Sequence, residues 1–192
     1  MKDMVKMGGL LLIVCTLAAT ALAGIYSITK PKIDFQKQSE LQQALMTALP
    51  GAAPDAIFPV ERDGRLLYYE GYQAADKQQL IGYAFVGTWP GYSSTIETMV
   101  GVDVSGKIIG LKVLDEKETP GLGTRTEEIK YGEHEPWFQR QFLGKDAATL
   151  AVDKDGGDVQ SITGATISSR AVTKSIISSF QQVQAQLSSK NE

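Results

Sequence analysis

A hydroxyl-rich segment, residues 161–169, combines the residue types that can hold a phosphate group. Two small residues, Gly164 and Ala165, lie within it, and its hydroxyl side chains surround them: Ser161, Thr163, Thr166 and Ser168. An amphipathic helix is predicted directly afterwards, and the first turn of a helix has free N–H groups at the positive end of its dipole. Such a position favours phosphate binding. The alternative is that these Ser and Thr residues act only as ordinary helix caps, which contribute about 1 kcal/mol and carry no chemistry. Of the four hydroxyl residues, we expect Ser168 to be the helix cap.

A second unusual segment, residues 118–124, reads Glu-Thr-Pro-Gly-Leu-Gly-Thr. Proline restricts one backbone angle, whereas glycine permits positive φ and close approach. We therefore expect a stiff loop with exposed N–H groups and with the hydroxyls of Thr119 and Thr124 available. Such a loop suits a flat ring or an anion, because little entropy is lost when it binds. A simple Pro-Gly turn is the alternative interpretation.

The composition excludes several other kinds of site. The chain has 192 residues and a net charge of −3, so it has no basic footprint for nucleic acid. Its single cysteine, Cys15, permits no intrachain disulfide, and its single histidine, His134, cannot build a histidine-rich metal site. Redox chemistry in this chain would therefore need an organic cofactor and not a cysteine-bound cluster. We expect no metal ligand and no catalytic acid–base pair, since Glu127 and Glu128 are adjacent in sequence and His134 lies in a charged loop.

Residues 7–29 carry no charge and are mostly apolar. A helix needs about 20 such residues to span a bilayer. We predict a short cytoplasmic N-terminus over residues 1–7, a transmembrane helix over 8–29 and an extracytoplasmic domain over 30–192. Lysines flank the span on both sides, so the charge pattern alone only suggests this orientation.

A cleaved signal peptide is the competing interpretation of this segment. Ala21-Leu22-Ala23 has the small-x-small pattern of a cleavage site. Apolar residues continue past Ala23 to Ile25 and Ile28, which favours a retained anchor.

The remaining chain predicts an antiparallel sheet flanked by helices, which is an α+β fold. Residues 54–59 are predicted as a loop after a helix that Pro50-Gly51 ends. A β-rich composition predicts strands over residues 66–72 and 80–87. Alternating apolar residues predict a strand over residues 95–104, which a turn at Ser105-Gly106 joins to a hairpin partner over residues 108–114. Apolar spacing and Pro136 predict helices over residues 34–49, 136–142 and 168–187. We place Trp137, Phe138 and Phe142 in the core.

These features together resemble the FMN-binding domain proteins. The order is one N-terminal membrane helix, Gly91-Tyr92 before a strand, Glu-Thr-Pro-Gly-Leu-Gly at 118–123, and Thr-Gly-Ala-Thr at 163–166 opening the last helix. Within the family the chain is most similar to the G subunit of the Rnf (Rsx) ion-translocating electron transport complex. The related C subunit of the sodium-translocating NADH:quinone reductase shares the plan and is generally longer. The resemblance covers nearly the whole chain.

The resemblance implies a covalent FMN, joined through its phosphate to Thr166. A separate flavin transferase makes this bond in the family, taking FMN from FAD outside the cytoplasm. The implied cofactor-binding residues, besides Thr166, are Ser161, Thr163, Gly164, Ala165, Ile167, Ser168, Glu118, Thr119, Pro120, Gly121, Leu122 and Gly123. The segment Trp89-Pro90-Gly91-Tyr92 could also line the flavin, although a core or turn role is an equal alternative.

One position departs from the family pattern. The family commonly has an acidic residue three positions before its first motif Thr, where this chain has Gln160, and Asp158 lies two residues earlier. Either the acidic requirement is soft, or Asp158 substitutes for it, or the transferase recognises this chain less well.

The resemblance further implies a function. The chain would be a non-autonomous flavoprotein component of a translocase in the bacterial inner membrane. It would relay electrons among the other subunits of a complex that couples electron transfer between ferredoxin and NAD to Na⁺ or H⁺ movement. Two alternatives are an independent extracytoplasmic FMN-dependent reductase and a non-redox membrane-anchored assembly protein.

Overall fold

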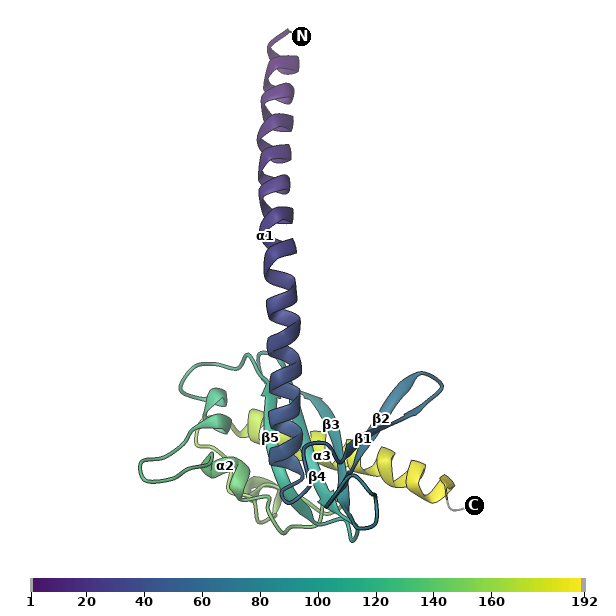
Figure 1. The fold of residues 1–192 in the computed structure, drawn as a ribbon. Helices are drawn as coiled ribbons and strands as arrows, with labels where there is room; N and C mark the ends of the chain where they lie inside the picture. The colour runs from purple at the N-terminus through teal and green to yellow at the C-terminus, as the bar shows by residue number, and fades with distance from the viewer. Residues whose placement is uncertain (1, 191–192) are drawn as a thin grey trace. The chain divides into compact units, whose positions relative to one another are not determined.

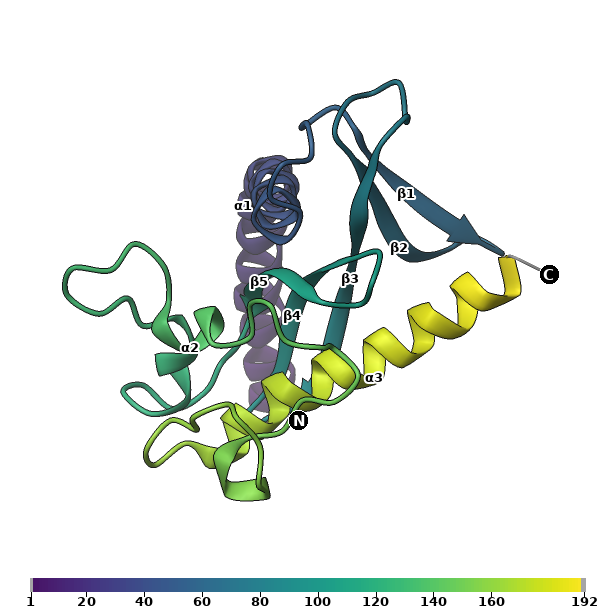
Figure 2. The same cartoon turned by 90° about the horizontal axis from the view of Figure 1, so that it is seen from below.

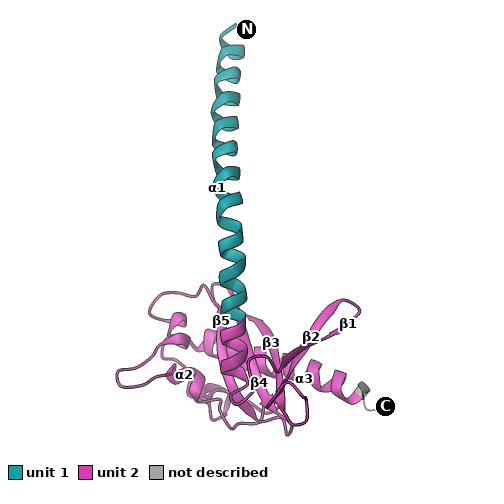
Figure 3. Ribbon diagram, in the orientation of Figure 1, with its two compact units in different colours: residues 1–41 teal, residues 42–192 magenta. Residues whose placement is uncertain are grey.

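The N-terminal part of the chain is one long helix. The computed structural model describes residues 2–190 and divides at residue 41 into two units (Figure 3). Helix α1 (Lys2–Ala48) continues through Pro31, and its last residues belong to the second unit. The sequence predicts a separate helix from residue 34, and the structure has a single one instead. A proline removes one helical hydrogen bond and its ring crowds the carbonyl one turn earlier, but the total cost of about 3 kcal/mol does not end a helix whose flanking segments both favour helix.

The apolar segment of α1 has the properties of a membrane span. Within residues 2–190, α1 is the one helix that is long and apolar enough to cross a bilayer. The apolar side chains in this part of the helix are exposed, including those of Leu11, Ile13, Leu17 and Leu22. Their exposure is what a lipid-facing segment requires.

The second unit contains a five-stranded antiparallel sheet, in which each strand pairs with its neighbours in sequence (Figure 1). The strands are β1 (Ile57–Arg62), β2 (Arg65–Tyr72), β3 (Leu80–Pro90), β4 (Thr95–Asp103) and β5 (Ile108–Asp115). The prediction of the last four strands is confirmed. The prediction of a loop over residues 54–59 is wrong, because β1 begins at Ile57 and contains Pro59. Proline is tolerated there because β1 is an edge strand, whose outward backbone groups need no partner in the sheet.

The centre of the sheet is buried on both faces. Helix α3 (Thr166–Lys190) packs across β3 and β4 (Figure 2), and Ser175 Oγ donates a hydrogen bond of 3.3 Å to Thr98 Oγ1 on β4. On the other face Gly101 lies against the end of α1, where a Cβ would overlap the carbonyl oxygen of Ala48. The sequence predicts one buried face of β4, and the alternate residues of that strand, such as Met99, are buried as well.

Three short elements complete the α+β fold. They are η1 (Gly123–Glu127), α2 (Trp137–Arg140) and η2 (Asp153–Asp155). The core positions predicted for Trp137, Phe138 and Phe142 are confirmed, since all three side chains are buried. These elements lie in the chain between β5 and α3, and η1 begins inside the Pro-Gly motif.

Candidate functional site

The two motifs, distant in sequence, line one cavity of about 540 Å³. Its walls come from the turn after β3, from the loop between β5 and η1, and from the start of α3. The lining residues are Tyr92, Glu118, Thr119, Leu122, Gly123, Gly164, Ala165, Thr166, Ile167 and Ser168. The volume lies within the range of about 300–1,000 Å³ that small-molecule and cofactor sites occupy.

Thr166 is the first residue of α3 and is half-buried at the cavity. The chain reaches it through Gly164, whose φ of +81° lies in the left-handed region. A Cβ on Gly164 would also come within 3.1 Å of Leu122 Cδ2, so the two motifs pack together at this point. The first N–H groups of α3, which have no intrahelical acceptors, therefore lie at the cavity wall beside the Thr166 hydroxyl group.

The prediction that Ser168 caps this helix is wrong. Ser168 is already the third residue of α3, and its Oγ donates a hydrogen bond of 2.6 Å to Glu118 Oε2. The adjacent Ser169 supports the helix start instead, because its Oγ accepts from Ile162 N and donates to Ala165 O, both at 3.0 Å. Helix α3 begins at Thr166, before its apolar stripe, which starts only at Val172. A helix start predicted from the stripe therefore falls too late, at residue 168.

Glu118 connects three segments of the site. Its side chain is buried, and its carboxylate accepts hydrogen bonds from Tyr92 N at 3.1 Å and from Ser93 N and Ser94 N at 3.0 Å, besides the bond from Ser168. Burial raises the pKa of this carboxyl group, but the hydrogen bonds from Ser168 and the three amides lower it by more, so the pKa lies below the usual glutamate value. Glu118 is therefore ionised at neutral pH.

The rest of the Pro-Gly loop is held by its own hydrogen bonds. Leu122 N donates to Thr119 O at 3.1 Å, and Gly121 N donates to Thr124 Oγ1 at 3.0 Å. The Thr124 hydroxyl oxygen, expected to be available, is thus engaged within the loop. Pro120 and Gly121 are exposed and do not line the cavity, although the resemblance includes them in the site.

Exposed apolar side chains surround the cavity. Tyr92, Leu122 and Ile167 are 72%, 41% and 48% exposed, and all three line it. The segment Trp89-Pro90-Gly91-Tyr92 divides between the cavity and the core. Tyr92 belongs to the cavity, whereas Trp89 packs against the core with the Lys174 ammonium group 5.6 Å from its ring.

The N-terminal half of the hydroxyl-rich segment lies outside the cavity. Ser161 is buried and its N–H donates to Asp153 Oδ1 at 3.0 Å, whereas Thr163 is exposed. Asp153 is thus an acidic residue beside the motif that sequence reasoning missed. Hydrogen bonds from Ser161 hold the pKa of Asp153 below its usual value.

Gln160 and Asp158 have structural partners of their own. The backbone N–H of Gln160 donates to Gln141 Oε1 at 2.8 Å, and Gln141 Nε2 donates to Gln160 O at 3.2 Å. The Asp158 side chain is 90% exposed and lies 3.8 Å from Lys145 Nζ. Of the two aspartates, Asp153 is the one that contacts the motif.

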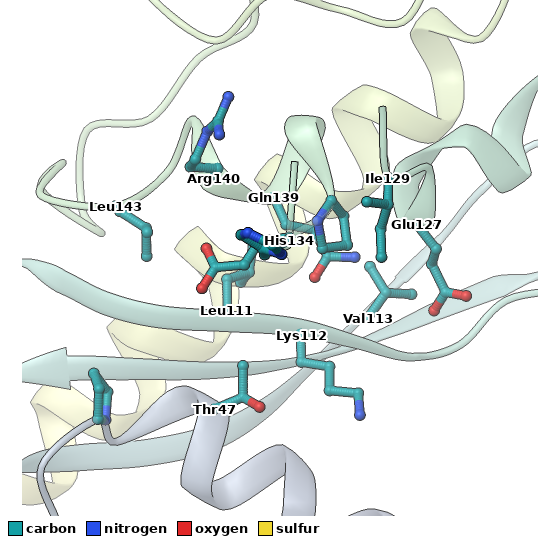
Figure 4. Close-up of a pocket in the computed structure, with 13 residues that line it drawn as sticks. Thr47, Leu111, Lys112, Val113, Glu127, Ile129, His134, Gln139, Arg140 and Leu143 are labelled. Carbon is teal, nitrogen blue, oxygen red and sulfur yellow. The ribbon is translucent and has the colours of Figure 1, made fainter. Parts of the chain in front are cut away.

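A second cavity of about 480 Å³ contains neither motif. It lies between the end of α1, β5 and the segment around α2, and Figure 4 shows Glu127, His134 and Gln139 among its lining residues. Burial, and then repulsion from Glu116, raise the pKa of Glu127. Among residues 2–190 there is no cluster of three or more histidine, cysteine or acidic side chains that could hold a metal ion.

Comparison with known proteins identifies two family regions. Residues 91–180 match the FMN-binding domain family, and residues 1–47 match the RnfG N-terminal region. The first region contains both motifs and the whole cavity.

Relatives of similar length match along most of the chain. The chain is 32% identical to the G subunit of the proton-translocating ferredoxin:NAD(+) oxidoreductase complex of Clostridium ljungdahlii, over 90% of this chain and 88% of the relative. It is 35% identical to the G subunit of the ion-translocating oxidoreductase complex of Aliivibrio fischeri, over 92% and 89% of the two chains. The corresponding protein of Methanosarcina acetivorans is 30% identical over 96% and 97%.

A solved structure has the same fold. The C subunit of the Na(+)-translocating NADH-quinone reductase from Parabacteroides distasonis superimposes with a TM-score of 0.54 at 20% identity, covering 80% of this chain and 93% of that one. The chain therefore belongs to the RnfG family, the G subunits of ion-translocating oxidoreductase complexes, as an electron-transport component with an FMN-binding domain and one apolar N-terminal helix.

Proposed function

We propose that this chain carries FMN covalently, through a phosphoester to Thr166, and relays electrons within a membrane complex. One observation supports this most strongly: Thr166 begins α3 and lines the same cavity as Glu118, Thr119, Leu122 and Gly123 of the Pro-Gly loop. The relative from Clostridium ljungdahlii belongs to a proton-translocating ferredoxin:NAD(+) oxidoreductase complex. By this similarity, the electron transfer would be coupled to the movement of H⁺ or Na⁺.

The residues at the cavity fit both ends of FMN. The first N–H groups of α3 and the Thr166 hydroxyl suit its phosphate, because a helix N-terminus favours negative charge. The apolar side chains of Tyr92, Leu122 and Ile167 suit a flat aromatic ring and would shield it from water. When bound, FMN supplies the capacity to accept and release electrons, and the chain supplies binding, orientation and electrostatic surroundings.

The proposed topology places the domain outside the cytoplasm. Residues 8–29 would span the membrane once, and residues 30–192 would lie on the periplasmic side, as they would in a bacterial inner-membrane complex. A flavin transferase acting there must reach the acceptor hydroxyl. The half-buried position of Thr166, next to the exposed Ile167, is compatible with that access.

Intact mass after membrane extraction tests the attachment site. The full chain, co-expressed with a flavin transferase, should gain the mass of one FMN phosphoester and fluoresce in a denaturing gel. Thr166→Ala should lose both signals, and Thr166→Ser, which keeps a hydroxyl group, should retain them. Thr119→Ala is the matched control, because Thr119 lines the same cavity but is not the proposed acceptor. Covalent flavin on the Thr166→Ala protein would contradict the assignment.

A further inference from the structure

We propose that Glu118 is a positioning residue of the flavin site, which joins the turn after β3 to the first turn of α3 and holds a negative charge at the cavity wall. This inference rests on the proposed function, because it takes the cavity to be the place of the flavin. It concerns a residue that contacts no reacting atom in the structure but fixes the segments around it.

The contacts of Glu118 connect segments that are far apart in sequence. Oε2 accepts from Tyr92 N at 3.1 Å and from Ser168 Oγ at 2.6 Å, and the latter pair is separated by 50 positions in the chain. Oε1 accepts from Ser93 N and Ser94 N at 3.0 Å and from Ser94 Oγ at 3.3 Å. The carboxylate thus accepts the hydrogen bonds of all three backbone N–H groups of residues 92–94, and its hydrogen bond with Ser168 orients that side chain within α3.

Two glycines pack closely against the Glu118 side chain. A Cβ at position 91 would come within 2.6 Å of Glu118 Oε1, and a Cβ at position 123 would overlap Glu118 Cβ and come within 2.7 Å of Ser168 Oγ. A side chain at position 123 would therefore disturb the contact between Glu118 and Ser168, and one at position 91 would displace the Glu118 oxygen that binds Ser93 and Ser94. The close packing of these glycines therefore supports the position of the Glu118 carboxylate in the site.

The charge of Glu118 is held by neutral dipoles. Its hydrogen-bond donors are three amides and two hydroxyl groups, and its own N–H donates to the neighbouring carboxylate Glu116 at 2.7 Å. The adjacent Lys117 pairs with Asp115 at 3.3 Å instead. Since Glu118 lines the cavity beside Thr166, its negative charge acts on whatever occupies that space. A negative charge opposes the addition of electrons to a nearby group, so Glu118 lowers the midpoint potential of a flavin held there.

The test compares the midpoint potentials of covalently loaded full-length proteins. Glu118→Gln removes the charge and should raise the potential, whereas Glu118→Asp keeps the charge and should remain close to the wild type. For a carboxylate charge roughly 10 Å from the flavin, Coulomb's law with an effective dielectric constant of about 20 gives an interaction that changes the reduced-to-oxidised ratio on the order of tenfold. For a two-electron couple this is about 30 mV.

Asp103 provides a matched control. Its carboxylate likewise accepts from the backbone and a hydroxyl group, at 2.8 Å from Ser105 N, 2.7 Å from Ser105 Oγ and 3.0 Å from Lys107 N. It lies in the β4–β5 turn, at the end of β4 opposite to the cavity. Asp103→Asn should leave the potential unchanged. An equal rise in this variant, or an unchanged potential in Glu118→Gln, would overturn the electrostatic role.

Hydrogen exchange tests the positioning role without any flavin. The amides of residues 92–94 should exchange faster in apo Glu118→Gln than in the apo wild type, and Asp103→Asn should not alter them. Unchanged exchange at residues 92–94 would refute the positioning role. If the wild-type protein acquires no covalent flavin from the transferase, the proposed function fails, and the exchange result still decides whether Glu118 holds the turn.

Discussion

Replacing Glu118 with glutamine should reduce the free energy of unfolding at neutral pH by about 2–4 kcal/mol. The amide can accept at one oxygen only. Its best orientation keeps that oxygen toward Ser93 N, Ser94 N and Ser94 Oγ, which all bind Oε1. The amide nitrogen then faces Tyr92 N, whose hydrogen bond is lost, while Ser168 Oγ can rotate and accept. The loss of this part-buried donor's partner costs about 1–3 kcal/mol, and the loss of charge weakens the bonds that remain.

The stability difference between the wild type and Glu118→Gln should depend on pH. Because the folded-state pKa of Glu118 is below its unfolded value, its stabilising contribution is complete above the unfolded pKa of about 4.3 and is lost as pH falls through the folded pKa. The stability difference between wild type and Glu118→Gln should therefore shrink as the pH is lowered from 7 toward about 3.

Urea unfolding of the full chain in detergent, followed by fluorescence of its two tryptophans, Trp89 and Trp137, measures this difference. Asp103→Asn serves as a comparator, because the pKa of Asp103 is also lowered and its contribution should fade in the same direction. A difference below about 1 kcal/mol at pH 7, or one that stays constant with pH, would refute the account of Glu118 as a buried ionised acceptor.

Three further predictions concern the packing around the site. Gly164→Ala places a side chain at a φ of +81° and near Leu122, so it should lower stability by about 1–2 kcal/mol and reduce flavin loading. Thermal unfolding measures the stability and intact mass the loading, and an unchanged melting temperature would contradict the predicted backbone strain. Gly101→Ala drives a Cβ into the Ala48 carbonyl and should destabilise the domain by about 1–3 kcal/mol or more in urea; a wild-type unfolding midpoint contradicts this. Arg170→Ala breaks an exposed ion pair with Asp155, at 2.6 Å, and should lower the free energy of unfolding by less than about 1 kcal/mol, with a smaller effect in high salt. A larger loss of stability that salt does not change would contradict its assignment as a surface ion pair.

Local patterns predicted most of the elements and failed at two prolines. Strands β4 and β5 follow from alternation and from the turn at Ser105-Gly106, because a hairpin is a local structure. The same local reasoning placed a break at Pro31 and a loop around Pro59. A proline shows only that one hydrogen bond is missing, and whether the helix or strand continues depends on its neighbours.

The two motifs were predictable from the sequence, but the contacts of their individual residues were not. The sequence alone determined that an apolar span precedes an α+β domain, that a hydroxyl-rich segment opens a helix and that a stiff loop precedes it. The tertiary structure decided that Ser168 binds Glu118 instead of capping α3, that Tyr92 joins the cavity, and that Pro120 and Gly121 lie outside it. Spacing along a chain specifies which residues share a turn or a face, whereas a contact across 50 positions depends on how the sheet and the helix pack.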